Sequence, residues 1–110
     1  MNRADALELY RSLPLPDTSM EAWRFTDLRG FDPDSFDQNG SAGVPTRDML
    51  EIDVSGLATA GGGKVEIDKL PDGVEFAALP EDHERLGTLV GADDKFTAHN
   101  AASWQSGLLV

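Results

Sequence analysis

The chain has 110 residues and a formal net charge of −11, because 20 Asp and Glu residues oppose 9 Lys and Arg residues. This length suits a single domain with a modest core. The acidic excess argues against nucleic acids and anionic membranes as partners, since both would repel the chain. It permits a basic protein partner, although a solvated acidic surface is the simpler interpretation.

The residues that are missing also limit the chemistry. The sequence contains no cysteine, which excludes disulfides, thiolate metal ligands and a cysteine nucleophile. The first residues lack the apolar core of a signal peptide, and no apolar run is long enough to span a bilayer. We therefore expect a cytoplasmic protein.

Residues 1–36 predict a helical segment. Asn2 is a candidate N-cap for a helix that ends near Leu13, where Pro14 removes a backbone donor. The helical spacing predicts one apolar stripe, made of Ala6, Leu9, Tyr10 and Leu13. Further along, the pair Asp32-Pro33 predicts one helical turn that reaches Phe36.

An aromatic corner follows the first helix. Thr18 and Glu21 have the spacing of a capping box, so a short helix is expected to begin near Met20. Trp23 would lie on that helix and Phe25 at its end. Two large aromatic side chains at such a corner bury much area, so we predict a packing anchor without a catalytic role.

After a predicted linker at residues 37–48, the apolar pattern changes to alternation, which predicts short strands. The alternating residues are Leu50, Ile52 and Val54, then Val65 and Ile67, and finally Val74 and Phe76. Pro71-Asp72-Gly73 is a predicted turn. Two more helices are expected, from Leu79-Pro80 to about Val90, with Gly91 beyond its end, and from a cap at Asp93 to about Gln105, with Gly107 beyond its end.

The last predicted helix places Phe96 and Trp104 on one face, and Leu108–Val110 continues as an apolar strand. The predicted fold class is thus α+β, with short N-terminal helices, a few short strands and two C-terminal helices in residues 49–110.

Three motif-like patterns fail their own requirements. Ala60–Val65 lacks the first glycine and the hydroxyl of a phosphate loop, so a flexible connector is expected. The aspartates from Asp32 onward do not follow the ligand order of a calcium loop. His83 and His99 lack the spacing of a zinc protease, and no nucleophile-elbow pattern is present. We therefore predict no enzyme activity.

Two segments resemble the SufD-type proteins of the SufB/SufD family, which acts in iron–sulfur cluster assembly. The first joins Leu-Pro-Leu-Pro at 13–16 to Glu-Ala-Trp-Arg-Phe-Thr-Asp-Leu at 21–28, with Phe25 in place of the family's Tyr. The second, at 94–110, resembles the family's Asp-Lys-Phe-x-x-Leu-Asn-x-Ala-x-x-x-x-Gly segment, with His99 in place of Leu. The motif residues are Trp23, Arg24, Phe25, Thr26, Asp27, Phe96, Asn100 and Trp104.

The resemblance implies a non-catalytic scaffold subunit that works with a SufB-like subunit and a SufC-like ATPase. In that family the first strands of a right-handed parallel β-helix begin where this sequence has Leu108–Val110, so we expect the sequence to be the N-terminal region of a longer protein. The family's cluster-related residues lie outside the matching segments, so no catalytic, cofactor-binding or metal residue is transferred. A free-standing acidic interaction domain with a basic protein partner is the alternative.

Overall fold

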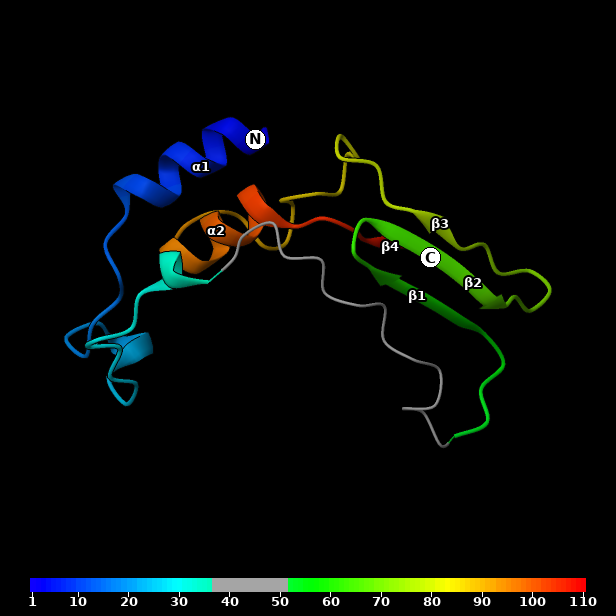
Figure 1. Cartoon of the computed structure of the whole chain (residues 1–110), viewed down its shortest axis with the longest axis horizontal. Coiled ribbons are helices and arrows are strands. Elements are labelled where there is room, and N and C mark those ends of the chain that lie inside the picture. Colours follow the sequence, from blue (N-terminus) through cyan, green and yellow to red (C-terminus); the bar gives the residue numbers. More distant parts are fainter. Residues whose placement is uncertain (37–51) are drawn as a thin grey trace. The chain divides into compact units, whose positions relative to one another are not determined.

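The computed structural model describes residues 1–36 and 52–110 (Figure 1). They form an α+β fold, as predicted, with two α-helices, two short 3-10 turns and two small antiparallel sheets in the described residues. The chain divides into two compact units. The helical unit comprises Met1–Asn39 and Glu84–Ser103, and the strand unit comprises Gly40–His83 and Trp104–Val110.

Helix α1 (Arg3–Ser12) begins as predicted. The Asn2 side chain accepts a hydrogen bond from the backbone amide of Asp5 at 2.9 Å, which satisfies one of the free donors of the first turn. The helix ends at Ser12, and the C-cap residue Leu13 has extended dihedral angles before Pro14. Ala6 and Tyr10 are buried, so the predicted apolar stripe carries the core face of this helix.

Helix α2 (Lys95–Ser103) packs against α1, and its Ala98 is completely buried. The predicted cap at Asp93 is wrong by one residue. Asp94 caps the helix, because its Oδ1 accepts hydrogen bonds from the amides of Phe96 at 2.8 Å and Thr97 at 2.9 Å. The helix is also shorter than predicted, since it ends at Ser103.

A β-hairpin forms the larger sheet of the strand unit. Strands β1 (Leu57–Gly61) and β2 (Lys64–Lys69) pair antiparallel, with Gly61 opposite Lys64. Gly62 and Gly63 connect them with φ values of 56° and 77°. Positive φ at both central residues is what a type I′ hairpin turn requires. Strand β2 was predicted. The flexible connector expected at Ala60–Val65 consists instead of this turn, the end of β1 and the start of β2.

The second sheet pairs β3 (Ala77–Ala78) with β4 (Leu108–Leu109). The predicted C-terminal strand is therefore confirmed, and the amide of Leu79 extends the pairing by donating to the carbonyl of Gly107 at 2.9 Å. The strand predicted from the alternation of Val74 and Phe76 with Glu75 and Ala77 is displaced, because only Ala77 of these residues lies in β3. The turn at Pro71-Asp72-Gly73 is confirmed by a hydrogen bond from the Val74 amide to the Pro71 carbonyl at 3.3 Å.

Three further predictions meet different outcomes. Residues 52–54 do not form a strand, while Leu50 and the linker at 37–48 lie outside the described residues. The turn at Pro33–Ser35 is confirmed, with Asp32 accepting from the amide of Asp34 at 2.9 Å. The helix predicted from Leu79-Pro80 to Val90 is wrong, because this stretch consists of turns.

Gly87 marks one point at which the predicted helix is interrupted. Its φ of 76° lies in the left-handed region, which interrupts a right-handed helix. The hydroxyl of Thr88 also donates to the backbone carbonyl of Arg85 at 2.8 Å, which stabilises a local turn.

Candidate functional site

The aromatic corner, residues 21–28, is the candidate site, and it is built on a single 3-10 turn, η1 (Glu21–Trp23). The predicted capping box is wrong: Met20 occupies the N-cap position, and no side chain caps it among the described residues. Asp17 organises the preceding turn instead. Its carbonyl accepts from the Met20 amide at 3.1 Å, and its carboxylate accepts from the Ser19 amide at 2.8 Å.

Trp23 anchors the corner to α2. Its ring stacks on that of Phe96, with the centroids 5.3 Å apart and the planes 29° from parallel. The ring centroid of Phe31 lies 6.2 Å from that of Phe96 and 5.9 Å from that of Phe36. Aromatic pairs at such distances attract one another beyond the area that they bury. Trp23 is therefore a packing anchor as predicted, although it is only half-buried.

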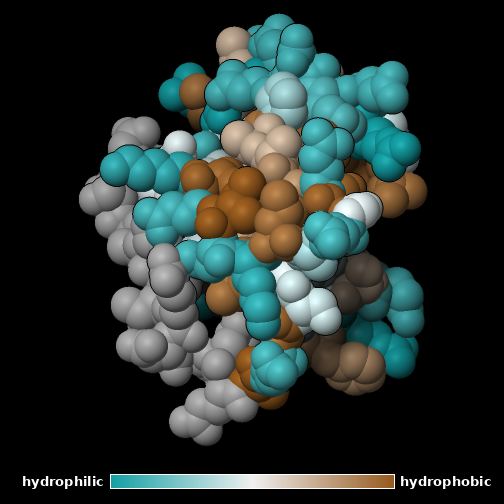
Figure 2. All heavy atoms as spheres, turned by 90° about the vertical axis from the view of Figure 1, so that its right-hand side faces the viewer, coloured by the Kyte–Doolittle hydropathy of each residue, from teal (hydrophilic) through white to brown (hydrophobic). Residues whose placement is uncertain are grey.

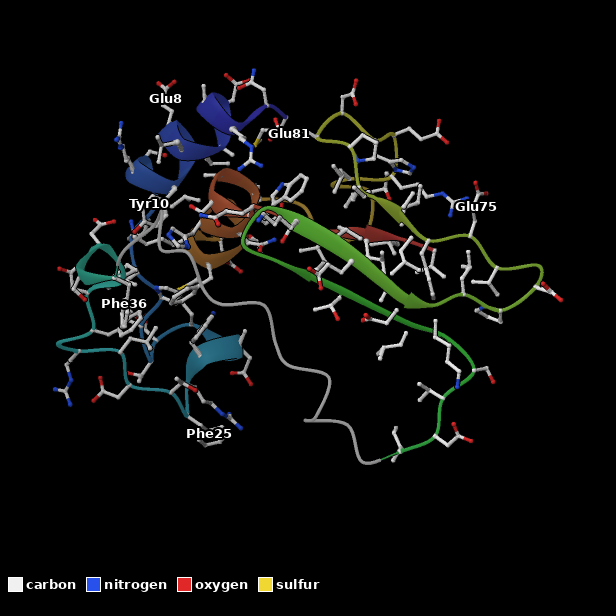
Figure 3. All side chains as sticks on the ribbon, turned by 45° about the vertical axis from the view of Figure 1, so that its right-hand side comes forward. Glu8, Tyr10, Phe25, Phe36, Glu75 and Glu81 are labelled. Carbon is white, nitrogen blue, oxygen red and sulfur yellow. The ribbon has the colours of Figure 1, made fainter. Side chains whose placement is uncertain are left out.

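Phe25 does not share this role. It is 89% exposed, so the expectation that it would be buried is wrong. Hydrogen bonds from the Trp23 amide to Met20 and from the Thr26 amide to Trp23, both 2.9 Å, form two successive turns around the corner. Figure 3 shows Phe25 at the periphery of its unit, away from α1 and α2.

Charged side chains border the exposed ring. The guanidinium carbon of Arg24 lies 4.5 Å from the centre of the Phe25 ring, and Arg24 also pairs with Glu21 at 3.5 Å. Asp27 holds Arg29 through hydrogen bonds of 2.6 to 3.0 Å. The side-chain hydrogen bond from Arg29 lowers the pKa of Asp27 below its ordinary value. The corner thus presents an aromatic ring among paired charges.

The motif residues are partly brought together. Trp23 meets Phe96, and Arg24 meets Phe25, while Thr26, Asp27 and Asn100 are exposed. Trp104 lies outside α2 and belongs to the strand unit, so the prediction that it shares a helix face with Phe96 is wrong.

We expect the two aromatic residues of the corner to differ in their effect on stability. Trp23→Ala should lower the free energy of unfolding by about 2 kcal/mol, less than the roughly 3–5 kcal/mol typical of a fully buried Trp, because the ring is half-exposed. Phe25→Ala should change it by less than about 0.5 kcal/mol. Urea unfolding of both variants measures this, and equal losses would contradict the division of roles.

A second cluster joins α1, α2 and the turn η2 (Pro33–Ser35), and the sequence did not predict it. The hydroxyl of buried Tyr10 donates to Asp34 Oδ1 at 2.6 Å, and the Tyr10 ring lies 4.8 Å from that of His99. Lys95 Nζ donates to the carbonyls of Tyr10 and Leu13, both at 2.9 Å, and lies 4.3 Å from the centre of the Tyr10 ring. Only the helical spacing of Tyr10 pointed toward this cluster, since the other members are remote in sequence.

The cluster raises the pKa of Tyr10 to about 12, first through burial and then through the hydrogen bond to Asp34. Between about pH 10 and 12 the folded chain therefore keeps the hydroxyl proton of Tyr10. In the unfolded chain, where the tyrosine has a pKa near 10.0, this proton is released. Because the folded state binds more protons there, the free energy of unfolding should fall as pH rises from about 10 to 12.

This prediction is simple to measure because Tyr10 is the only tyrosine. An ultraviolet titration of the native chain should show tyrosinate appearing near pH 12 rather than 10. In Tyr10→Phe the fall in stability over this pH range should be smaller. An ordinary titration near pH 10 would contradict the role of the cluster.

Neither cluster has the composition of a metal site. Within residues 1–36 and 52–110, no three His, Asp or Glu side chains are grouped so that they could hold a metal ion. None of the helices in these residues is both long and apolar enough to cross a membrane.

Comparison with known proteins gives no relative. No protein-family model matches the chain, and neither the curated proteins nor the solved structures contain a match. The function is therefore inferred from the residues and their contacts.

Proposed function

We propose that this chain is the N-terminal region of a SufD-like, non-catalytic scaffold subunit in iron–sulfur cluster assembly, and that it acts through protein–protein contacts. Its partners would be a SufB-like subunit and a SufC-like ATPase. The observation that supports the proposal is the stacking of Trp23 on Phe96. The two segments that carry the resemblance lie about 70 residues apart in sequence, and their aromatic motif residues are in contact.

The exposed part of the corner is the proposed contact surface. Phe25 is an unburied aromatic ring with an arginine beside it, and aromatic residues and arginine are enriched among the residues that dominate binding energy. Trp23 holds this surface on α2, so the corner is ordered before a partner arrives. In the proposed whole protein, β4 would continue into the first strands of a right-handed parallel β-helix.

Binding to purified SufB-type and SufC-type proteins tests the proposal. Calorimetry should detect a complex with the SufB-type protein or with the pair. Phe25→Ala should weaken this complex about tenfold or more, as expected of a residue at the centre of an interface. Leu70→Ala is the matched control, because Leu70 is also an exposed apolar residue, 53% accessible, but belongs to the strand unit.

The outcomes separate the parts of the proposal. Equal binding by both variants would contradict the role of Phe25 but not the partners. Failure of the unchanged chain to bind either protein would contradict the proposed function.

The charge of the strand unit favours the alternative, an acidic interaction domain. Its exposed carboxylates outnumber its two exposed lysines, Lys64 and Lys69, and include Glu66, Asp72, Glu75, Glu81 and Asp82. Figure 3 shows Glu75 extending outward. If this alternative holds, binding to any basic partner should weaken strongly as the salt concentration rises from about 0.05 to about 0.3 M, because salt screens exposed charges. This loss should be the same with and without the Phe25→Ala substitution.

A further inference from the structure

Residues 84–91 contain three exposed, large apolar side chains. This segment lies between β3 and α2, where the chain runs without a helix in Figure 1. Leu86 is 39% accessible, Leu89 97% and Val90 65%. Apolar side chains do occur on protein surfaces, as the brown spheres among teal ones in Figure 2 illustrate. Three within five residues, one of them almost fully accessible, are nevertheless typical of a binding segment.

The spacing of the three residues matches a helix rather than the observed turns. Leu86, Leu89 and Val90 follow the i, i+3, i+4 order that gathers side chains on one helix face. In the observed turn Gly87 has a φ of 76°, a conformation that glycine adopts without steric cost. A Cβ added at Gly87 in the present turn would meet nothing within 4 Å, so an alanine there would not clash with its surroundings.

The neighbouring charges indicate which surface would accept this segment. Exposed carboxylates lie on both sides of the apolar residues, at Glu84 and Asp93, and the exposed Arg85 lies beside Glu84, in a chain whose net charge is −11. A partner surface with acidic borders would repel them, whereas Lys and Arg beside an apolar groove would attract them.

We propose that residues 84–91 form a docking segment that becomes helical when Leu86, Leu89 and Val90 enter an apolar groove bordered by basic side chains on a partner protein. Short segments of this kind bind through anchors at helical spacing and become ordered on contact. The proposal does not depend on the proposed function, because it uses neither the aromatic corner nor the resemblance.

An amphipathic peptide made only of Leu and Lys serves as the probe, because its helix presents an apolar face bordered by ammonium groups. In a titration of the ¹⁵N,¹³C-labelled full chain, the largest shift changes should fall within residues 84–91. The carbon shifts of this segment should move toward helical values. A peptide with Glu in place of Lys should bind at least about tenfold more weakly, because the carboxylates would repel it.

Two matched pairs of variants test the anchors and the helix. Leu89→Ser should weaken peptide binding about tenfold or more, because burial of this side chain is lost, whereas Leu70→Ser should not change it. Gly87→Ala should strengthen binding about fivefold, because alanine favours the helix. Gly73→Ala is its control, since Gly73 has a similar φ of 78° and equally open surroundings but lies in another turn.

Several results would overturn the proposal. One is unchanged peptide binding by Leu89→Ser. This variant should fold normally, because the Leu89 side chain is 97% accessible and contributes little packing. Others are shift changes spread over all the acidic residues, equal binding of the Glu-containing peptide, or no binding at millimolar peptide. If the same signals shift on simple concentration of the chain, a second copy is the occupant and the proposal is also wrong.

Discussion

Ala98→Asp should abolish cooperative folding of the helical unit. Ala98 is completely buried on α2, where this helix packs against α1, and Ala6 on α1 is also completely buried. A carboxylate at this position would lose its water without gaining an equivalent partner, which costs at least about 3 kcal/mol. This is a large share of the roughly 5–15 kcal/mol that stabilises a typical domain.

Thermal unfolding followed by circular dichroism measures this effect. Ala98→Leu should also destabilise the unit, by about 1–3 kcal/mol, because the added methyl groups must push the helices apart. Ala4→Asp is the control, since Ala4 is exposed on α1, and it should leave the melting curve nearly unchanged. A normal melt for Ala98→Asp would show that the two helices do not form the core of this unit.

The second large effect is expected at Lys95. Its ammonium group donates to the carbonyls of Tyr10 and Leu13 at the C-terminal end of α1. These carbonyls have no partner further along the helix, and a cation is favourable beside them. Lys95→Met keeps most of the side chain's length but removes the charge and the donors, so the free energy of unfolding should fall by about 2 kcal/mol.

Lys64→Met controls for the loss of one positive charge, because Lys64 is exposed on β2. It should change the stability by less than about 0.5 kcal/mol. Urea unfolding at neutral pH decides between the two. If both variants lose the same amount, net charge rather than the contact with α1 would be the cause.

The sequence predicted the elements whose signals are local. Asn2 and Pro14 mark both ends of α1, Asp32-Pro33 marks a turn, and the alternation around Val65 marks β2. The cap of α2 was displaced by one residue because Asp93 and Asp94 are both suitable caps, and only the geometry selects Asp94.

Errors arose where a single backbone conformation or a distant contact decides the structure. A positive φ at Gly87 interrupts a helix whose apolar spacing looked sound, and positive φ at Gly62 and Gly63 turns an apparent connector into a hairpin. At the candidate site, the aromatic residues of the corner were recognised, but their division into half-buried Trp23 and exposed Phe25 was not. That division depends on the position of Phe96, which no local pattern reports.

The division of the chain into units has a consequence for the order of folding. The helical unit needs residues from both Met1–Asn39 and Glu84–Ser103, and the bonds from Lys95 to α1 join residues 82 and 85 positions apart. Contacts this remote must close a long loop, which costs entropy and slows folding, whereas a hairpin closed by two glycines forms in about 1–10 μs. During synthesis α1 therefore leaves the ribosome without its packing partner, and it stays exposed to proteases and chaperones until α2 follows.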